Sequence, residues 1–134
     1  MTLDVIPGCY AVCRLEAAAA IPPWASGGAL SSITRTTQEL SIVCDAEAVP
    51  SEVRAARGYR ALAVRGPLDF ALVGIVASLS AALAAGGVSL FVVSTYDTDY
   101  VLVKGDDLGR AIAALEGAGH RVVTGGGASS PPRS

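Results

Sequence analysis

Ser94-Thr95-Tyr96-Asp97-Thr98-Asp99 is the polar stretch that decides the fold of the second half of this chain. It separates two runs rich in β-branched and aromatic residues, Val88-Ser89-Leu90-Phe91-Val92-Val93 before it and Tyr100-Val101-Leu102-Val103 after it. Strand-forming runs joined by a few turn-forming residues predict a β-hairpin. We therefore expect residues 88–104 to form a hairpin whose turn carries hydroxyl and carboxylate side chains.

An apolar helix is predicted immediately before the hairpin, from Gly74 to Ala85. Gly86-Gly87 is a typical helix end, and the loop of residues 66–73 leads into the helix start. We expect the helix start and the hairpin turn to face each other across one sheet edge and to form a pocket for a small zwitterion. The apolar positions that recur at helical spacing are Ile75, Val76, Leu79, Ala82 and Leu83.

The rest of the chain alternates strand and helix patterns. We expect a strand at residues 9–15, a hairpin from 29–34 and 40–44, and a short helix at 51–57, where Pro and Glu suit a first turn. A strand at 59–65 follows that helix. After the second hairpin, Asp106 and Asp107 are expected to cap a helix that ends at Gly117, before a last strand at 120–124. Residues 125–134, rich in Gly, Ser and Pro, are predicted to be a disordered tail.

The two halves resemble each other when the chain is shifted by 60 residues. The shift places Ile33-Thr34 on Val93-Ser94 and Ile42-Val43 on Leu102-Val103. Each half therefore reads strand, crossover, strand, strand, helix, strand, and the strand at 59–65 closes the first half while it opens the second. The crossover of the first half is too short and too rich in proline for a full helix.

Length and composition predict one ordinary domain, or two small halves sharing a core, because 51% of the 134 residues are apolar and only 16% are charged. The net charge of −2 and the scattered arginines provide no basic patch for nucleic acid or an anionic membrane. No signal-peptide pattern stands at the start, and no apolar stretch reaches the roughly 20 residues of a membrane span. We expect a cytoplasmic protein that binds neither nucleic acid nor membrane.

The three cysteines, Cys9, Cys13 and Cys44, suit a reducing compartment because their number is odd. We interpret them as small buried hydrophobic residues. A metal site needs more ligands than the single His120 provides, and that histidine lies far along the chain from any nucleophile candidate. We expect no metal, no cofactor and no catalytic residue.

The predicted pocket matches the chemistry of a free amino acid. A carboxylate is stabilised by backbone N–H groups at a helix N-terminus, and Gly74 has no side chain to hinder its approach. An ammonium group is bound by carboxylates, which Asp97 and Asp99 provide. Plainer interpretations stay open. Aspartates are common turn formers, a tight helix start alone is enough to explain Gly74, and Tyr96 is either a pocket wall or a solvated aromatic.

A family resemblance rests on three segments. They are Gly66-Pro67-Leu68-Asp69-Phe70-Ala71-Leu72-Val73-Gly74-Ile75-Val76-Ala77-Ser78-Leu79, then Gly87-Val88-Ser89-Leu90-Phe91, and residues 94–103. Together they resemble an ACT domain of the kind found in CASTOR arginine sensors, similar also to aspartokinase regulatory domains. The first half, with Ser31-Ser32-Ile33-Thr34 and Glu39-Leu40-Ser41-Ile42-Val43, resembles the more degenerate ACT module that precedes it in those proteins.

The resemblance implies an α+β fold of two ferredoxin-like βαββαβ modules, packed side by side through a shared or paired antiparallel sheet. It divides the chain into a degenerate N-terminal ACT-like module at 1–58, a C-terminal ACT module at 59–124 and the tail at 125–134. Arginine sensors have an acidic residue where this chain has Leu72, and a buried guanidinium without an anion is costly, so the ligand is expected not to be arginine. The implied ligand contacts are Asp69, Leu72, Gly74, Ile75, Ser89, Leu90, Thr95, Tyr96, Thr98 and Asp99.

Three functions are compatible with these features. The first is a non-catalytic regulatory protein that binds a free amino acid at a module or dimer interface, as a homodimer because one chain carries a single well-formed module. The second is a protein-interaction or oligomerisation module with a vestigial pocket. The third, a small enzyme with Asp97 or Asp99 as base, is disfavoured because no activated nucleophile, metal cluster or phosphate-binding loop accompanies them.

Overall fold

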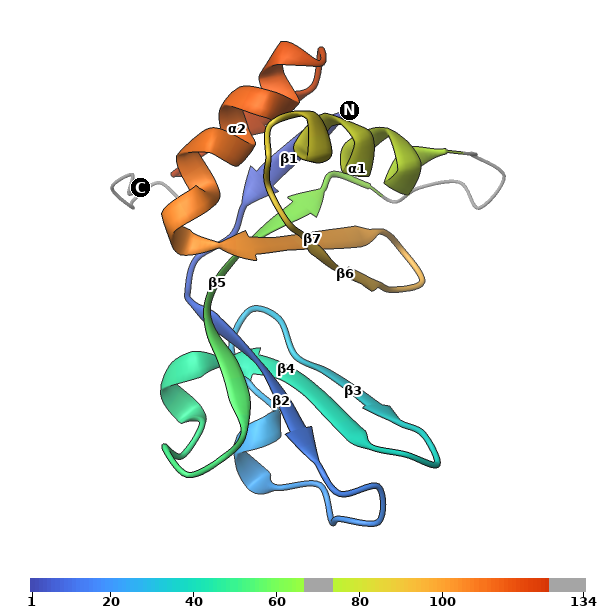
Figure 1. Cartoon of the computed structure of the whole chain (residues 1–134), viewed down its shortest axis with the longest axis vertical. Coiled ribbons are helices and arrows are strands. Elements are labelled where there is room, and N and C mark those ends of the chain that lie inside the picture. The colour runs from blue at the N-terminus through green and yellow to red at the C-terminus, as the bar shows by residue number, and fades with distance from the viewer. Residues whose placement is uncertain (67–73, 126–134) are drawn as a thin grey trace. The chain divides into compact units, whose positions relative to one another are not determined.

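The structure is a computed structural model that describes residues 1–66 and 74–125 (Figure 1). It is a mixed α+β fold, as expected, and its described residues divide into two compact units. We call residues 7–59 the N-terminal unit, and residues 1–6 with those from Arg60 onward the C-terminal unit. The elements are β1 (Thr2–Val5), β2 (Tyr10–Leu15), η1 (Pro23–Ala25), β3 (Ser32–Arg35), β4 (Leu40–Asp45), η2 (Ala46–Ala48), β5 (Ala55–Val64), α1 (Ile75–Ala85), β6 (Phe91–Ser94), β7 (Asp99–Lys104), η3 (Gly105–Asp107), α2 (Leu108–Gly117) and β8 (Arg121–Val123).

The C-terminal unit has the strand order β6-β7-β5-β1-β8. Strand β1 is antiparallel to β5 and parallel to β8. The predicted hairpin is confirmed: β6 and β7 are antiparallel, with Phe91 paired to Leu102 and Ser94 paired to Asp99. This order is that of a βαββαβ unit formed by β5, α1, β6, β7, α2 and β8, with β1 inserted beside the first strand.

Both α-helices of this unit pack on one face of its sheet, as the upper part of Figure 1 shows. Alternate residues of each strand face the helices, so the apolar positions of strand and helix meet in one core. Burial of this apolar surface is the main force that holds the helices in place. The core consists of Leu3, Leu62, Val64, Leu79, Ala82, Leu83, Val88, Val101, Val103, Leu108, Ala111 and Leu115.

The N-terminal unit has the strand order β3-β4-β2-β5, in which only the first half of β5 takes part. Its neighbouring strands are antiparallel throughout. The short turns η1 and η2 stand where a βαββαβ unit has helices. Its separate core contains Ala11, Cys13, Ala25, Leu40, Ile42, Cys44 and Val49.

The prediction of a helix at residues 51–57 is wrong. Residues 51–53 form a turn, and β5 already begins at Ala55, where it pairs with β2. The Arg57 side chain stabilises this conformation. Its guanidinium donates hydrogen bonds to the carbonyl oxygens of Ala46, Val49 and Pro50 at 3.3, 3.4 and 2.9 Å. Pairing with β2 satisfies backbone groups of Ala55 and Ala56, and the guanidinium satisfies carbonyl oxygens of the residues before the turn.

Two smaller expectations also need correction. Cys13 and Cys44 are buried as predicted, but Cys9 is exposed, because it lies in the turn before β2. Asp107 precedes α2 without a capping hydrogen bond, since its carboxylate accepts from Arg110 at 2.5 Å instead.

The internal repeat is present with an offset of 59 residues, not 60. Adding 59 to β3, β4 and η2 gives the bounds of β6, β7 and η3. Thr36 therefore corresponds to Thr95, and the pair Arg35 and Leu40 corresponds to Ser94 and Asp99. An offset of 60 also superimposes hydrophobic residues, because β4 and β7 each contain three consecutive buried residues rather than a strict alternation.

No helix within the described ranges is long and apolar enough to cross a membrane. Within the same ranges, no three His, Cys, Asp or Glu side chains are grouped in a way that could hold a metal ion.

Candidate functional site

The β6–β7 turn is closed by two threonines. The Thr95 amide donates to the Thr98 carbonyl oxygen at 2.8 Å, and the Thr95 hydroxyl donates to the same oxygen at 3.1 Å. The Thr98 amide donates back to the Thr95 hydroxyl at 3.3 Å. Threonine favours such local bonds to the backbone, so the turn has a defined conformation without any ligand.

Two further hydrogen bonds fix the base of the turn. The Ser94 hydroxyl donates to Asp99 Oδ1 at 2.5 Å, across the last residue pair of the hairpin. The Thr98 hydroxyl donates to the Val64 carbonyl oxygen at 2.6 Å, at the end of β5. The turn is thereby attached to the last residue of β5.

The start of α1 is marked by a glycine. Gly74 precedes the helix with φ of +84°, a left-handed conformation that favours glycine, and no side chain among the described residues caps the helix. The Ser78 amide donates to the Gly74 carbonyl oxygen at 2.8 Å, and the first turn of α1 contains no acidic residue. A Cβ on Gly74 would meet nothing within 4 Å, so backbone conformation explains this glycine better than crowding does.

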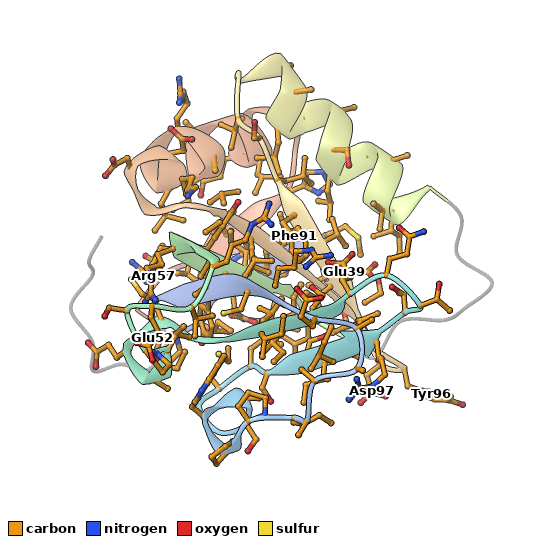
Figure 2. All side chains as sticks on the ribbon, turned by 60° about the horizontal axis from the view of Figure 1, so that its bottom comes forward. Glu39, Glu52, Arg57, Phe91, Tyr96 and Asp97 are labelled. Carbon is orange, nitrogen blue, oxygen red and sulfur yellow. The ribbon has the colours of Figure 1, made fainter. Side chains whose placement is uncertain are left out.

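The other predicted contacts are distributed as follows. Ile75 and Leu90 are partly buried against the core of the C-terminal unit, and Ser89 is exposed. Tyr96 is 82% exposed at the tip of the turn, and Figure 2 shows it projecting outward beside Asp97. Asp69 and Leu72 lie outside the described residues.

The structure therefore places Thr95, Thr98 and Asp99 together and connects them to the end of β5. In Figure 1 the start of α1 and the β6–β7 turn both lie on the right side of the C-terminal unit. That the two face each other around one ligand stays a prediction.

Sequence reasoning missed a cluster around His120. Its Nδ1 lies 3.3 Å from the Met1 amino nitrogen, and its Nε2 lies 3.5 Å from the Ser78 hydroxyl in the first turns of α1. Burial and then the Met1 ammonium lower the pKa of His120 below its ordinary value. No local pattern could have revealed this cluster, because it depends on parallel pairing of Thr2–Asp4 in β1 with Arg121–Val123 in β8.

An ion pair on the neighbouring strands was also missed. Arg65 Nε donates to Asp4 Oδ2 at 3.1 Å, and Arg65 Nη2 donates to Asp4 Oδ1 at 2.6 Å. The Arg65 side chain is 53% exposed and that of Asp4 is 33% exposed, so solvent screens the pair and it adds little stability.

Family comparisons agree with this architecture. A family model described as an ACT domain matches residues 54–117, a range that runs from β5 into α2. A second family model, described as an N-terminal domain, matches residues 8–52. No curated protein matches the chain.

Among solved structures, a protein of Agobacterium tumefaciens superposes with a TM-score of 0.86 at 43% identity, over 91% of each chain. A Vibrio cholerae protein of unknown function, described as a possible transport protein, has a TM-score of 0.71 at 22% identity, over 87% of this chain and 88% of that one. The ligand-free regulatory subunit of Thermus thermophilus aspartate kinase has a TM-score of 0.56 at 11% identity, over 87% of this chain and 97% of that one.

The last two likenesses show a shared fold. The Thermus thermophilus structure confirms the expected relation to aspartokinase regulatory domains at the level of the fold. The closer likeness to CASTOR sensors and the tandem of two ACT modules stay predictions. The chain carries an ACT domain and belongs to the same family as the Agobacterium tumefaciens protein.

Proposed function

We propose that this protein is a non-catalytic regulatory protein that binds a free amino acid through its ACT domain. The ligand lies between residues 66–75 and the turn of residues 94–99. The observation that carries the proposal is the ACT match at 54–117, which contains both segments. The aspartate kinase regulatory subunits that share the fold support a regulatory role.

The two ends of an amino acid suit the two segments. The N–H groups at the start of α1, where the helix dipole is positive and the first turn has no acidic residue, attract the carboxylate. Asp99, partly buried at the base of the turn, attracts the ammonium group. Each charge-assisted hydrogen bond contributes about 1.5–3 kcal/mol, so a few of them suffice for micromolar binding.

The side chain of the ligand is expected to be neutral or apolar. Residue 72, two positions before Gly74, is leucine, which offers no negative charge to a guanidinium group. Burying an unpaired cation is costly, which argues against arginine.

Two copies of the chain form the complete site in this proposal. The N-terminal unit has the strand order of a βαββαβ module but only short turns in place of its helices, so we interpret it as a degenerate ACT module. It has no long helix whose start could bind the carboxylate. A second C-terminal unit, from another copy, is the partner expected at the site, and a bound ligand would then stabilise the dimer.

A second function is favoured by Tyr96. A tyrosine that is 82% exposed at a hairpin tip is well placed for contact with a partner protein, since tyrosine is frequent among the residues that dominate interfaces. In that case the turn serves protein interaction or oligomerisation, and the ligand pocket is vestigial.

Thermal unfolding with each of the twenty amino acids at millimolar concentration distinguishes the two functions. Amino-acid binding predicts that at least one raises the melting temperature saturably and that Asp99→Ala abolishes the shift. Asp106→Ala is the matched control, because it removes an exposed carboxylate of the same unit away from the turn. If no amino acid raises the melting temperature, the interaction module is the better description.

A further inference from the structure

We propose that Ser94 is a positioning residue for the Asp99 carboxylate. By binding one carboxylate oxygen, it holds Asp99 in the orientation that receives a ligand's ammonium group at the other oxygen. This inference rests on the proposed function and assigns a role to a residue outside the predicted set of ligand contacts.

The geometry of the pair is well suited to this role. Ser94 is the last residue of β6 and Asp99 the first of β7, and the two are directly paired across the hairpin. The 2.5 Å distance between Ser94 Oγ and Asp99 Oδ1 is typical of a hydroxyl bonded to an ionised carboxylate. A carboxylate can accept about four hydrogen bonds, so the serine leaves acceptor capacity for a ligand.

The backbone on both sides of Asp99 is fixed as well. The mutual bonds of Thr95 and Thr98 close the turn, and the Thr98 hydroxyl attaches it to Val64. A carboxylate held in this way loses little conformational freedom when a ligand arrives, and such preorganisation increases affinity.

The internal repeat indicates that the hairpin does not need this pair. In the N-terminal unit, the Thr36 amide donates to the Glu39 carbonyl oxygen at 2.9 Å, and the Glu39 amide donates to the Thr36 hydroxyl at 3.1 Å. These bonds match those of Thr95 and Thr98, and the turn has the same length. The base of this turn is Arg35 and Leu40, so the same hairpin closes without a serine–aspartate bond.

The two residues of the equivalent pair have structural roles. Leu40 is fully buried, and the Arg35 guanidinium donates to the Ala17 carbonyl oxygen. The Ser94–Asp99 pair is therefore a feature of the C-terminal turn that hairpin formation does not explain. Of these two hairpin turns, the β6–β7 turn is therefore the one suited to an ammonium group.

Calorimetric titration tests the role, with an amino acid that raises the melting temperature in the panel above. Ser94→Ala is expected to weaken its binding roughly 5- to 10-fold, the effect of one lost hydrogen bond, and Ser94→Thr to restore it. In an Asp99→Asn background, Ser94→Ala is expected to have no further effect, because the carboxylate that it positions is gone. The control variant is Arg35→Ala, at the position of the N-terminal unit that is equivalent to Ser94. It is expected to bind the amino acid with the affinity of the wild type.

The inference is overturned if Ser94→Ala lowers the affinity for the amino acid equally in the wild-type and Asp99→Asn backgrounds. It is also overturned if Ser94→Ala lowers the affinity in neither background. A readout without ligand separates it from the proposed function: the carboxyl carbon resonance of Asp99 should move in Ser94→Ala and return in Ser94→Thr. If none of the twenty amino acids binds, the proposed function fails, and this resonance alone decides whether Ser94 positions the carboxylate. A resonance unchanged by Ser94→Ala contradicts the inference even if an amino acid binds.

Discussion

Gly86 and Ala114 are in such close approach that a Cβ on Gly86 would lie 2.7 Å from the Cβ of Ala114. The pair lies where the end of α1 meets α2, and real Cβ atoms do not come so close. Since φ at Gly86 is −87°, any residue could adopt its backbone conformation, so space alone requires glycine here.

Gly86→Ala is expected to destabilise the protein by about 1–3 kcal/mol, because the added methyl group forces the two helices apart. Urea unfolding measures the change. Gly117→Ala is the matched control: nothing lies within 4 Å of its Cβ position, so its stability should be unchanged or slightly higher. If Gly86→Ala is as stable as the wild type, Gly86 and Ala114 are not as close as described. The same follows if adding Ala114→Gly to the Gly86→Ala variant restores none of the lost stability.

Thr98→Val is expected to lower the free energy of unfolding by about 1 kcal/mol. The change keeps the shape of the side chain but removes the hydroxyl that donates to the Val64 carbonyl oxygen at 2.6 Å in a partly buried place. Thr98→Ser retains the hydroxyl and should recover most of the loss. Equal stability of the valine variant and the wild type would show that this bond does not hold the turn to β5.

The three cysteines are expected to differ in reactivity. Burial raises the pKa of the Cys44 thiol to about 11 and also raises that of Cys13, so neither forms appreciable thiolate at pH 8, whereas Cys9 is exposed. Brief alkylation of the native protein, read by mass spectrometry, should add one group, and Cys9→Ser should abolish it. In denaturant all three thiols should react. Two or three groups on the native protein would contradict the burial of Cys13 and Cys44.

Stability should depend on the protonation of His120. Its pKa is lower in the folded chain than its ordinary value of 6.5, so the unfolded chain binds the proton more tightly. The stabilising contribution is therefore present above pH 6.5 and is lost as the pH falls from 6.5 through the folded-state pKa. His120→Gln should flatten the pH dependence of the free energy of unfolding in that window. A slope that His120→Gln leaves unchanged would exclude this linkage.

The elements that could be predicted are those whose signal is local. Glycines and helical spacing fixed the ends of α1 within a residue, and the polar turn at 94–99 identified the β6–β7 hairpin. The same holds for α2, whose Leu108, Ile112 and Leu115 recur at helical spacing.

The elements that could not be predicted depend on residues far apart in the sequence. Residues 51–57 have a helical composition, yet pairing with β2 and the hydrogen bonds of Arg57 make them a turn and a strand. The cluster of Met1, Ser78 and His120 exists only because β1 lies beside β8. Of the candidate site, the turn chemistry was predictable, whereas the pairing of Ser94 with Asp99 required the hairpin register.

The central claim is that one molecule is bound by the start of α1 and by the β6–β7 turn together. A nuclear magnetic resonance titration of the labelled protein with each of the twenty amino acids tests this claim most directly. We predict that at least one amino acid shifts the amide resonances of residues 74–77 and 95–99 with the same saturation curve. The claim is contradicted if no amino acid shifts the resonances of either group of residues. It is also contradicted if amino acids shift the resonances of one group and never those of the other.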